Sequence, residues 1–218
     1  MIEVSCSALL FDMDGVLTDS TKAVERVWMK WAIVHGFNPY EVAAKAHGRP
    51  SISTVRDYLP RADHEAENRI VERAEIADLE GVAQVPGAGE LLAKLPADRY
   101  AVVTSSTRAL AEVRLRAVGL EIPEHFVTSS DIVNGKPHPE PYLRAARELG
   151  FSPAACIVVE DVPAGITAGK AAGCKVIALR TTTSETEVRR AGADWVLDDC
   201  RQIGICSEEE RLHLRLQV

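Results

Sequence analysis

Short apolar runs recur along the chain, and most of them are separated by segments with a helical pattern. Six runs consist mainly of Val, Ile, Leu, Ala or aromatic residues and show no alternation of polar and apolar positions. This pattern is typical of strands that are buried on both faces of a sheet. The runs predict strands at residues 8–11, 100–103, 125–127, 157–159, 175–179 and 195–197.

The segments between these runs have apolar residues at every third or fourth position, which predicts helices. Proline begins several of these segments, and Gly150 and Gly173 follow two of them, as helix termini favour. The alternation of strands and helices predicts an α/β fold, a Rossmann-like core with a mainly parallel sheet flanked by helices. The predicted helices span residues 86–95, 107–118, 139–149, 163–172 and 184–191.

Residues 18–84 interrupt the alternation, because their pattern predicts four helices and no strand. The segment directly follows the first strand. We therefore expect an all-helical cap domain of residues 18–84 inserted into a core domain of residues 1–17 and 85–218. The alternative is that part of this segment belongs to the core as one long crossover. The helices are expected at residues 21–35, 39–46, 52–58 and 62–79.

Three further parts of the sequence predict structural features. Trp28 and Trp31 lie three positions apart, so we expect them in the core of the insert rather than on a substrate platform. The charge-rich helix at residues 61–80 is expected to present a solvated face. The last segment, residues 207–218, is predicted to be an amphipathic helix that packs on the core or on a partner chain.

Composition narrows the class of protein. The chain has 218 residues, of which 46% are hydrophobic and 26% charged, so it can form a full core and is not intrinsically disordered. A net charge of −7 disfavours nucleic acid and anionic membranes as partners. No transmembrane helix or signal peptide is visible. Five cysteines without a Cys-x-x-Cys pair favour reduced, mostly buried thiols and a cytoplasmic location. We expect a monomer or a small homo-oligomer.

Polar side chains follow four of the predicted strands, at the edge where open parallel sheets bind ligands. Neighbouring carboxylates repel unless a cation lies among them, and oxygen ligands without His or Cys favour Mg²⁺. Hydroxyls, helix-start N–H groups and one lysine suit a phosphate, and a carboxylate can attack phosphorus. These residues therefore predict a Mg²⁺-dependent phosphate site: Asp12, Asp14, Thr104, Ser105, Ser106, Lys136, Glu160 and Asp161.

Each of these groups also has a simpler structural explanation. Residues 104–106 could serve as a helix N-cap, Lys136 could be a solvated surface charge, and residues 160–161 could cap the following helix. Their joint placement at four strand ends is what favours a functional site.

The same residues carry a resemblance to a known family. Residues 11–20 (FDMDGVLTDS), 103–105 (VTS), 136–137 (KP) and 159–161 (VED) resemble, in order, the four motifs of the haloacid dehalogenase-like hydrolase superfamily. The resemblance covers essentially the whole chain. A helical cap directly after the first motif resembles the subfamily that contains β-phosphoglucomutase and small sugar phosphatases.

The resemblance implies a role for each site residue. Asp12 would be the nucleophile and a Mg²⁺ ligand. Asp14 would be the general acid and base, and its backbone carbonyl would also contact the metal. Asp161, with Glu160 acting directly or through water, would complete the Mg²⁺ shell. Ser105, Ser106 and Lys136 would bind the phosphoryl group.

The resemblance also bears on the reaction. Dehalogenases resemble this fold but lack an acid at the position of Asp14, so that residue favours phosphoryl chemistry. Phosphomutases of the β-phosphoglucomutase type usually carry a histidine ten residues beyond the acid/base Asp, where this chain has Val24. This difference favours a phosphatase. A phosphomutase and a phosphate-binding regulatory protein are the alternatives.

Residues 104–108, 135–143 and 160–174 resemble yeast-type glycerol-3-phosphatases and 2-deoxyglucose-6-phosphatases, which implies a small sugar or polyol monophosphate as substrate. In those enzymes a cap loop reads His-Gly-x-Arg. Here Arg49 follows Gly48 directly, and Pro50 occupies the usual Arg position. Arg49 and His47 are therefore candidates for substrate specificity. The alternatives are a solvated loop arginine and a histidine at a helix C-terminus.

Overall fold

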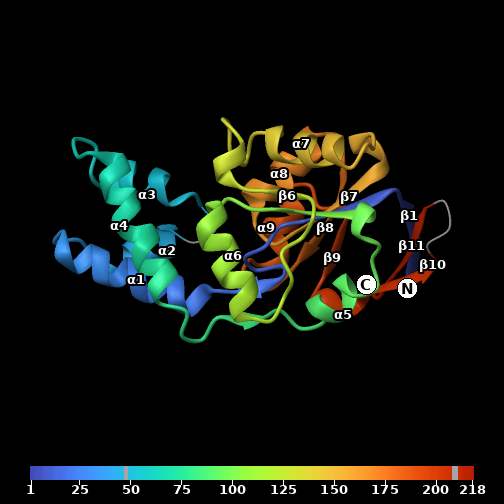
Figure 1. Cartoon of the computed structure of the whole chain (residues 1–218), viewed down its shortest axis with the longest axis horizontal. Coiled ribbons are helices and arrows are strands. Elements are labelled where there is room, and N and C mark those ends of the chain that lie inside the picture. The colour runs from blue at the N-terminus through green and yellow to red at the C-terminus, as the bar shows by residue number, and fades with distance from the viewer. Residues whose placement is uncertain (47–48, 208–210) are drawn as a thin grey trace.

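A parallel sheet of six strands forms the centre of the computed structural model, which describes residues 1–46, 49–207 and 211–218 (Figure 1). All neighbouring strands in this sheet run parallel. The six apolar runs are thus confirmed as strands. In spatial order they are β6 (Phe126–Val127), β5 (Tyr100–Val103), β2 (Ala8–Phe11), β7 (Cys156–Glu160), β8 (Lys175–Leu179) and β9 (Trp195–Leu197).

Side chains from both faces of this sheet are buried, which explains why its strands lack polar alternation. On one face, Leu9 and Phe11 of β2 join a cluster with Leu115 of α6. On the other face, Leu10 joins a cluster with Ile166 of α8. The flanking helices are α5 (Ala88–Leu92), α6 (Arg108–Ala117), α7 (Glu140–Glu148), α8 (Pro163–Ala171) and α9 (Glu185–Arg190). Short 3-10 helices span Ala97–Arg99, Ser129–Asp131, Pro153–Ala155 and Cys200–Gln202.

The C-terminal segment is a strand, so the predicted amphipathic helix at residues 207–218 is wrong. β11 (Leu212–Leu216) pairs antiparallel with β1 (Ile2–Cys6) and β10 (Ile203–Ser207) in a second, three-stranded sheet. Leu212, Leu214 and Leu216 are two positions apart and buried, whereas the residues between them are exposed. A period of two is the period of a strand, and the three leucines join the core cluster below β2.

Four helices lie together at one end of the molecule, at the left of Figure 1, beyond α6. They connect β3 (Thr18–Asp19) with β4 (Ala83–Gln84), which pair antiparallel, so the expectation of no strand in residues 18–84 is wrong. The helices are α1 (Thr21–Val34), α2 (Pro39–Ala46), α3 (Ser51–Tyr58) and α4 (His64–Ala77), and we refer to them as the cap helices. The division of the chain into two domains stays a prediction.

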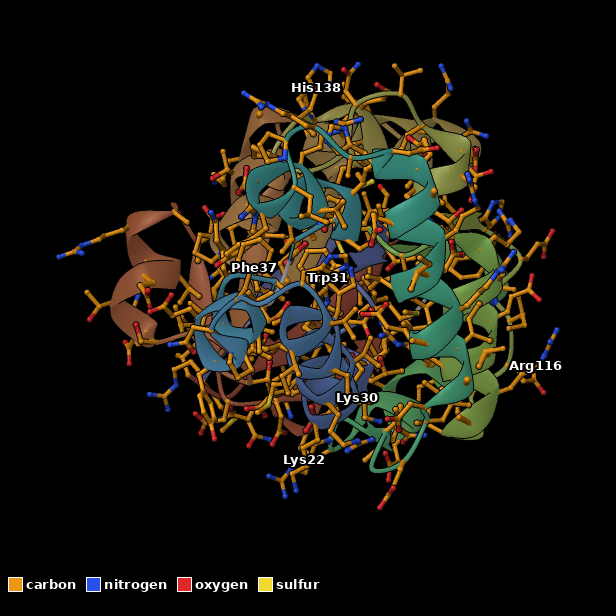
Figure 2. All side chains as sticks on the ribbon, turned by 90° about the vertical axis from the view of Figure 1, so that its left-hand side faces the viewer. Lys22, Lys30, Trp31, Phe37, Arg116 and His138 are labelled. Carbon is orange, nitrogen blue, oxygen red and sulfur yellow. The ribbon has the colours of Figure 1, made fainter. Side chains whose placement is uncertain are left out.

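The cap helices have a hydrophobic cluster of their own. Trp28 and Trp31 are buried in it together with Val42, Val55 and Val71, which confirms that both belong to this core, although Trp28 also lines the cavity beside the strand ends. Their rings meet edge to face at a centroid distance of 5.3 Å, and Trp31 also stacks on Phe37. Figure 2 looks onto this end of the molecule, with Trp31 and Phe37 among the helices that face the viewer.

The structure also bears on the cysteines and on the length and polarity of the helices. Cys6, Cys156, Cys174 and Cys200 are buried free thiols and Cys206 is an exposed one, as the cysteine pattern predicted. Among the described residues, no helix is both long enough and apolar enough to cross a membrane.

Candidate active site

Three carboxylates and one ammonium meet at the carboxyl ends of the central strands. Asp12 follows β2, Glu160 ends β7, and Asp161 comes next. Each offers an oxygen atom, and these atoms all lie within 4.8 Å of one another. Lys136, from the loop between β6 and α7, donates to Asp12 Oδ1 at 2.6 Å and to Glu160 Oε1 at 2.7 Å. The fold thus brings together the ends of strands that are far apart in the sequence.

Burial sets the electrostatics of this cluster. It raises the pKa of Asp12 to about 7, although the charge of Lys136 opposes the shift. Burial also raises the pKa of Asp161, and the charges of Glu160 and Asp12 add to that effect. For Lys136, burial acts to lower the pKa, but the adjacent Asp12 and Glu160 outweigh it and hold the pKa above its ordinary value. The cluster therefore contains more potential negative charge than one ammonium group balances.

The donor set fits a divalent cation. Asp161 Oδ1 is buried and has no hydrogen-bond partner among the described residues, while Oδ2 accepts a hydrogen bond from the Thr182 hydroxyl. Gly15 has a φ of +85°, and a Cβ there would lie 2.0 Å from Asp161 Oδ2, so only glycine permits this close approach. Carboxylate oxygens without nearby His or Cys suit Mg²⁺.

The oxygens of Glu160 are already occupied by donors. Oε1 accepts from Lys136 and from the Tyr142 hydroxyl at 2.8 Å. Oε2 accepts from the backbone N–H groups of Asp161 and Val162, at 3.0 and 3.3 Å. A Cβ at Gly165 would lie 1.6 Å from Oε1, so that position also requires glycine. These contacts favour Glu160 as the group that holds Lys136 in place, and its contact with a metal stays a prediction.

The Asp14 carboxylate lies apart from this cluster and accepts four hydrogen bonds. Oδ1 accepts from the hydroxyls of Ser20 at 2.7 Å and Thr18 at 3.2 Å. Oδ2 accepts from Arg114 Nη1 at 2.9 Å and from Ser106 Oγ at 3.2 Å. The Asp14 side chain is 28% exposed and lines the same cavity as Asp12. One carboxylate is therefore buried against a lysine, and the other is held at the cavity wall.

The loop after β5 supplies the remaining phosphate candidates. Ser105 lines the cavity together with Lys136. Ser106 donates from its hydroxyl to Asp14 and from its backbone N–H to Thr104 Oγ1. The N-cap of α6 is Thr107, whose side chain accepts from the N–H of Leu110. Residues 104–106 thus precede the helix cap, and their role in phosphate binding stays a prediction.

A cavity lies between these strand ends and the cap helices. Arg49 lines it, but both terminal nitrogens of its guanidinium donate to Asp57 at 3.1 Å. His47 falls outside the described residues. On the cap side the polar lining includes Thr21, Arg49, Ser51, Asn68, Glu72 and Glu75.

We expect the charge-rich helix at residues 61–80 to be solvated, and this expectation is wrong for one of its faces. Asn68, Glu72 and Glu75 of α4 are four and three positions apart, lie on one face of the helix, and line the cavity. Glu75 is only 7% exposed. Charge-rich composition alone does not distinguish a solvated face from one that faces a polar cavity.

The contributors to the site that the sequence does not predict include Glu75, Arg114, Tyr142 and Thr182. Arg114 had a signal in the sequence, because it lies four positions after Leu110 and three after Ala111, on the apolar face of α6. A charged residue on a buried face needs a partner. Tyr142 and Thr182 gave no comparable signal, because their contacts with Glu160 and Asp161 arise only in the folded chain.

Known proteins resemble this chain in sequence. A family model described as haloacid dehalogenase-like hydrolase matches residues 6–173. Hexitol phosphatase A of Escherichia coli is 40% identical over 208 residues, which cover 93% of this chain and 95% of that protein. Glycerol-1-phosphate phosphohydrolase 2 of Saccharomyces cerevisiae is 33% identical over 216 residues, covering 94% of this chain and 86% of that protein.

A solved structure supports the fold. A hydrolase from Pseudomonas syringae superposes with a TM-score of 0.80 and is 24% identical, covering 89% of this chain and 94% of that one. The resemblance that the four motifs carry is thereby confirmed at the level of family and fold.

Proposed function

This chain belongs to the haloacid dehalogenase-like hydrolase family, and we propose that it is a Mg²⁺-dependent phosphatase of small sugar or polyol monophosphates that works through an aspartyl-phosphate. One observation carries the proposal. Asp12 lies against Lys136 on the wall of a cavity that Asp14 also lines, so a nucleophile, a cation and a second carboxylate face one space. The names of the relatives above, a hexitol phosphatase and a glycerol-1-phosphate phosphohydrolase, support the substrate class.

In the first step the Asp12 carboxylate attacks phosphorus, and the ester P–O bond breaks as the new P–O bond forms. Asp14 donates a proton to the departing alkoxide, which is too basic to leave readily without one. Lys136 is already beside Asp12 and protonated, so it offsets the repulsion between the nucleophile and the phosphate dianion.

In the second step Asp14, now ionised, removes a proton from a water molecule that attacks the aspartyl-phosphate. The bond between phosphorus and Asp12 breaks, inorganic phosphate leaves, and Asp14 again carries the proton for the next cycle. Asp12 and Asp161 would hold Mg²⁺, which would supply positive charge to the phosphoryl oxygens. Ser105 would position the phosphoryl group beside Lys136.

The cap side of the cavity favours a substrate with hydroxyl groups and one phosphate. Ser51 donates to Asn68 at 2.6 Å, and these side chains, with Glu72, offer hydrogen-bonding groups without positive charge. Arg49 is the cation among the described cap residues of the lining, and it is paired with Asp57. A second phosphate would meet acidic and neutral groups here, which disfavours the bisphosphate intermediate of a phosphomutase. Val24 also lines the cavity and cannot transfer a proton.

The test is phosphate release from a panel of esters. It includes glycerol phosphate, hexitol phosphates, 2-deoxyglucose 6-phosphate and β-glucose 1-phosphate, with EDTA and Asp12→Asn as controls. We expect EDTA-sensitive release that is lost in the variant. Conversion of β-glucose 1-phosphate to the 6-phosphate without release would support the phosphomutase. No reaction of any ester with folded protein and Mg²⁺ would overturn an enzymatic role.

A further inference from the structure

We propose that Arg114 is a positioning residue that fixes the carboxylate of Asp14 for proton transfer and links it to the cap helices through Glu75. The inference rests on the proposed function, because Asp14 transfers a proton only in that reaction. Arg114 lies outside the four motifs, on α6. Among the described residues it forms no hydrogen bond or ion pair with Asp12, Glu160 or Asp161.

The burial of Arg114 is the first observation. Its side chain is 4% exposed, and its neighbours Ala111 and Leu115 on the same helix are core residues. Arginine is almost never buried to this degree unless it is paired. The Nε atom is also buried, and it has no hydrogen-bond partner among the described residues. A buried and incompletely satisfied guanidinium costs stability, so its contacts need a reason other than stability.

The contacts of the guanidinium are the second observation. Nη1 donates to Asp14 Oδ2 at 2.9 Å and approaches Ser106 Oγ at 3.4 Å. Nη2 lies 3.6 Å from Glu75 Oε2. Asp14 belongs to the loop after β2, whereas Glu75 belongs to α4. One side chain therefore joins the acid/base candidate to a cap helix.

A second polar contact lies beside the first. The hydroxyl of Thr107, at the start of α6, donates to the Glu72 carboxylate of α4. Glu72 and Glu75 are separated by one helical turn, so α4 meets α6 through two adjacent carboxylates. Such contacts depend on geometry more strongly than apolar packing does, because a hydrogen bond weakens steeply with distance and angle. The contact between Arg114 and Glu75 therefore depends on the position of α4.

The two oxygens of Asp14 are held from different sides. Thr18 and Ser20, at the entrance to the cap helices, hold Oδ1. Arg114 and Ser106, from the core, hold Oδ2. Removal of Arg114 frees Oδ2 from its charged partner and lets the carboxylate rotate toward Thr18 and Ser20. A general acid that is misplaced by about 1 Å loses much of its effect, because proton transfer requires hydrogen-bond reach.

The test separates positioning of the acid from general damage to the fold. Arg114→Gln is compared with Arg116→Gln, a matched control on the same helix whose side chain is 65% exposed and points outward in Figure 2. The readout is kcat/KM for glycerol phosphate and for p-nitrophenyl phosphate. The parameter kcat/KM reports the steps through the first phosphoryl transfer, and p-nitrophenolate leaves without a proton whereas an alkoxide does not.

We expect Arg114→Gln to lower kcat/KM by about 100-fold for glycerol phosphate and by less than about 5-fold for p-nitrophenyl phosphate. Guanidinium ion at tens of millimolar is expected to restore part of the glycerol phosphate activity of Arg114→Ala, whereas NaCl is not. Arg116→Gln is expected to match the wild type with both esters. Equal losses with the two esters, or no loss with either, would overturn the inference.

A second variant decides the question if Arg114→Gln does not fold. Glu75→Gln keeps the volume of the side chain and leaves Arg114 on Asp14, so we expect the same selectivity with a smaller loss, about 5-fold, for glycerol phosphate. A loss of equal size with both esters would contradict the link to the cap. A wild-type protein that hydrolyses neither ester would refute the proposed function, and the inference with it, so the two failures are distinguishable.

Discussion

The two carboxylates of the first motif are two residues apart but lie in different surroundings. Asp12 is buried among groups that all come from the parallel sheet and its loops, namely Lys136, Glu160 and Asp161. Asp14 is held by Thr18 and Ser20 on one side and by Arg114 on the other, and Arg114 also contacts Glu75 of the cap helices. The proposed nucleophile thus belongs to the central sheet, whereas the proposed acid/base belongs to the boundary between the sheet and the cap helices.

The two regions thus place carboxylates with different proposed roles. Asp12, which we propose attacks the phosphoryl group, directly follows β2, a strand that β5 and β7 fix on both sides. The group that must meet a variable leaving group is placed by contacts that the cap helices share. The activity of variants in the two regions should therefore depend differently on the leaving group of the ester.

Asp12→Asn should have the largest effect, a loss of activity of about 10⁴-fold or more, because it removes the nucleophile. The loss should be the same for glycerol phosphate and p-nitrophenyl phosphate, since both esters need the attack. Steady-state phosphate release measures it. Asp98→Asn is the control, because that side chain is 75% exposed on a 3-10 helix. An Asp12→Asn variant with more than a few per cent of wild-type activity, free of contaminating enzyme, would disprove the role of Asp12.

Asp14→Asn should lower kcat/KM for glycerol phosphate by about 10² to 10⁴-fold, the range of general acid catalysis. The loss with p-nitrophenyl phosphate should be much smaller in kcat/KM, although kcat should fall because the second step still needs a base. Comparison of the two kinetic parameters for both esters checks this. An equal loss of kcat/KM with both esters would contradict the proposed difference between the two regions.

Lys136→Met should reduce activity by about 10² to 10³-fold, because it removes a preorganised charge beside the reacting phosphoryl group. It should also destabilise the fold by about 3–5 kcal/mol, since Glu160 is then buried without its cation. The double variant Lys136→Met/Glu160→Gln should recover most of the stability and none of the activity. Urea unfolding and phosphate release measure the two effects. A double variant as unstable as the single one would show that the Lys136–Glu160 pair is not the cause.

The smallest predicted effect is a dependence of stability on pH. Burial raises the pKa of Glu75 to about 7, against the charge of Arg114, and the charges of Asp14 and Glu72 add to the increase. The unfolded pKa is lower, near about 4.3. The folded state therefore binds the proton more tightly, and this stabilisation is present below about pH 4 and is lost as the pH rises through 7.

Glu75→Gln cannot ionise, so its free energy of unfolding relative to the wild type should rise by about 2–3 kcal/mol between pH 5 and pH 8. Other titrating groups are common to both proteins and largely cancel in the difference. Urea unfolding at the two pH values measures it, with Glu65→Gln, an exposed residue of the same helix, as control. A difference that stays constant with pH would mean that Glu75 does not titrate in this range.

The strand ends could be predicted from the sequence for a physical reason. A parallel sheet brings the carboxyl ends of its strands to one edge, so apolar runs followed by Asp12, Lys136 and Asp161 predict a shared site without further detail. The partners within the site could not be predicted in the same way. The pairing of Arg114 with Glu75 joins two helices whose relative position only the folded chain defines.

The C-terminal strand shows a different limit. Leu212, Leu214 and Leu216 alternate with polar residues, and this short pattern is compatible with a strand as well as with the helix that we predict for residues 207–218. Strand β1 was not anticipated, and without it and β10 the segment has no hydrogen-bonding neighbours. Short segments whose structure depends on distant partners are the least predictable, because their local pattern carries little information.

The most direct test of the account uses the two carboxylates together. Asp14→Asn protein is mixed with p-nitrophenyl phosphate and Mg²⁺, quenched within the first turnover, treated with borohydride, and analysed by peptide mass spectrometry. We predict a burst of about one equivalent of p-nitrophenolate and reduction of the acyl-phosphate at residue 12 to homoserine, because phosphorylation needs no acid while hydrolysis lacks its base. A phosphoryl group on another residue, or phosphate released in step with p-nitrophenolate from the first turnover, would contradict it.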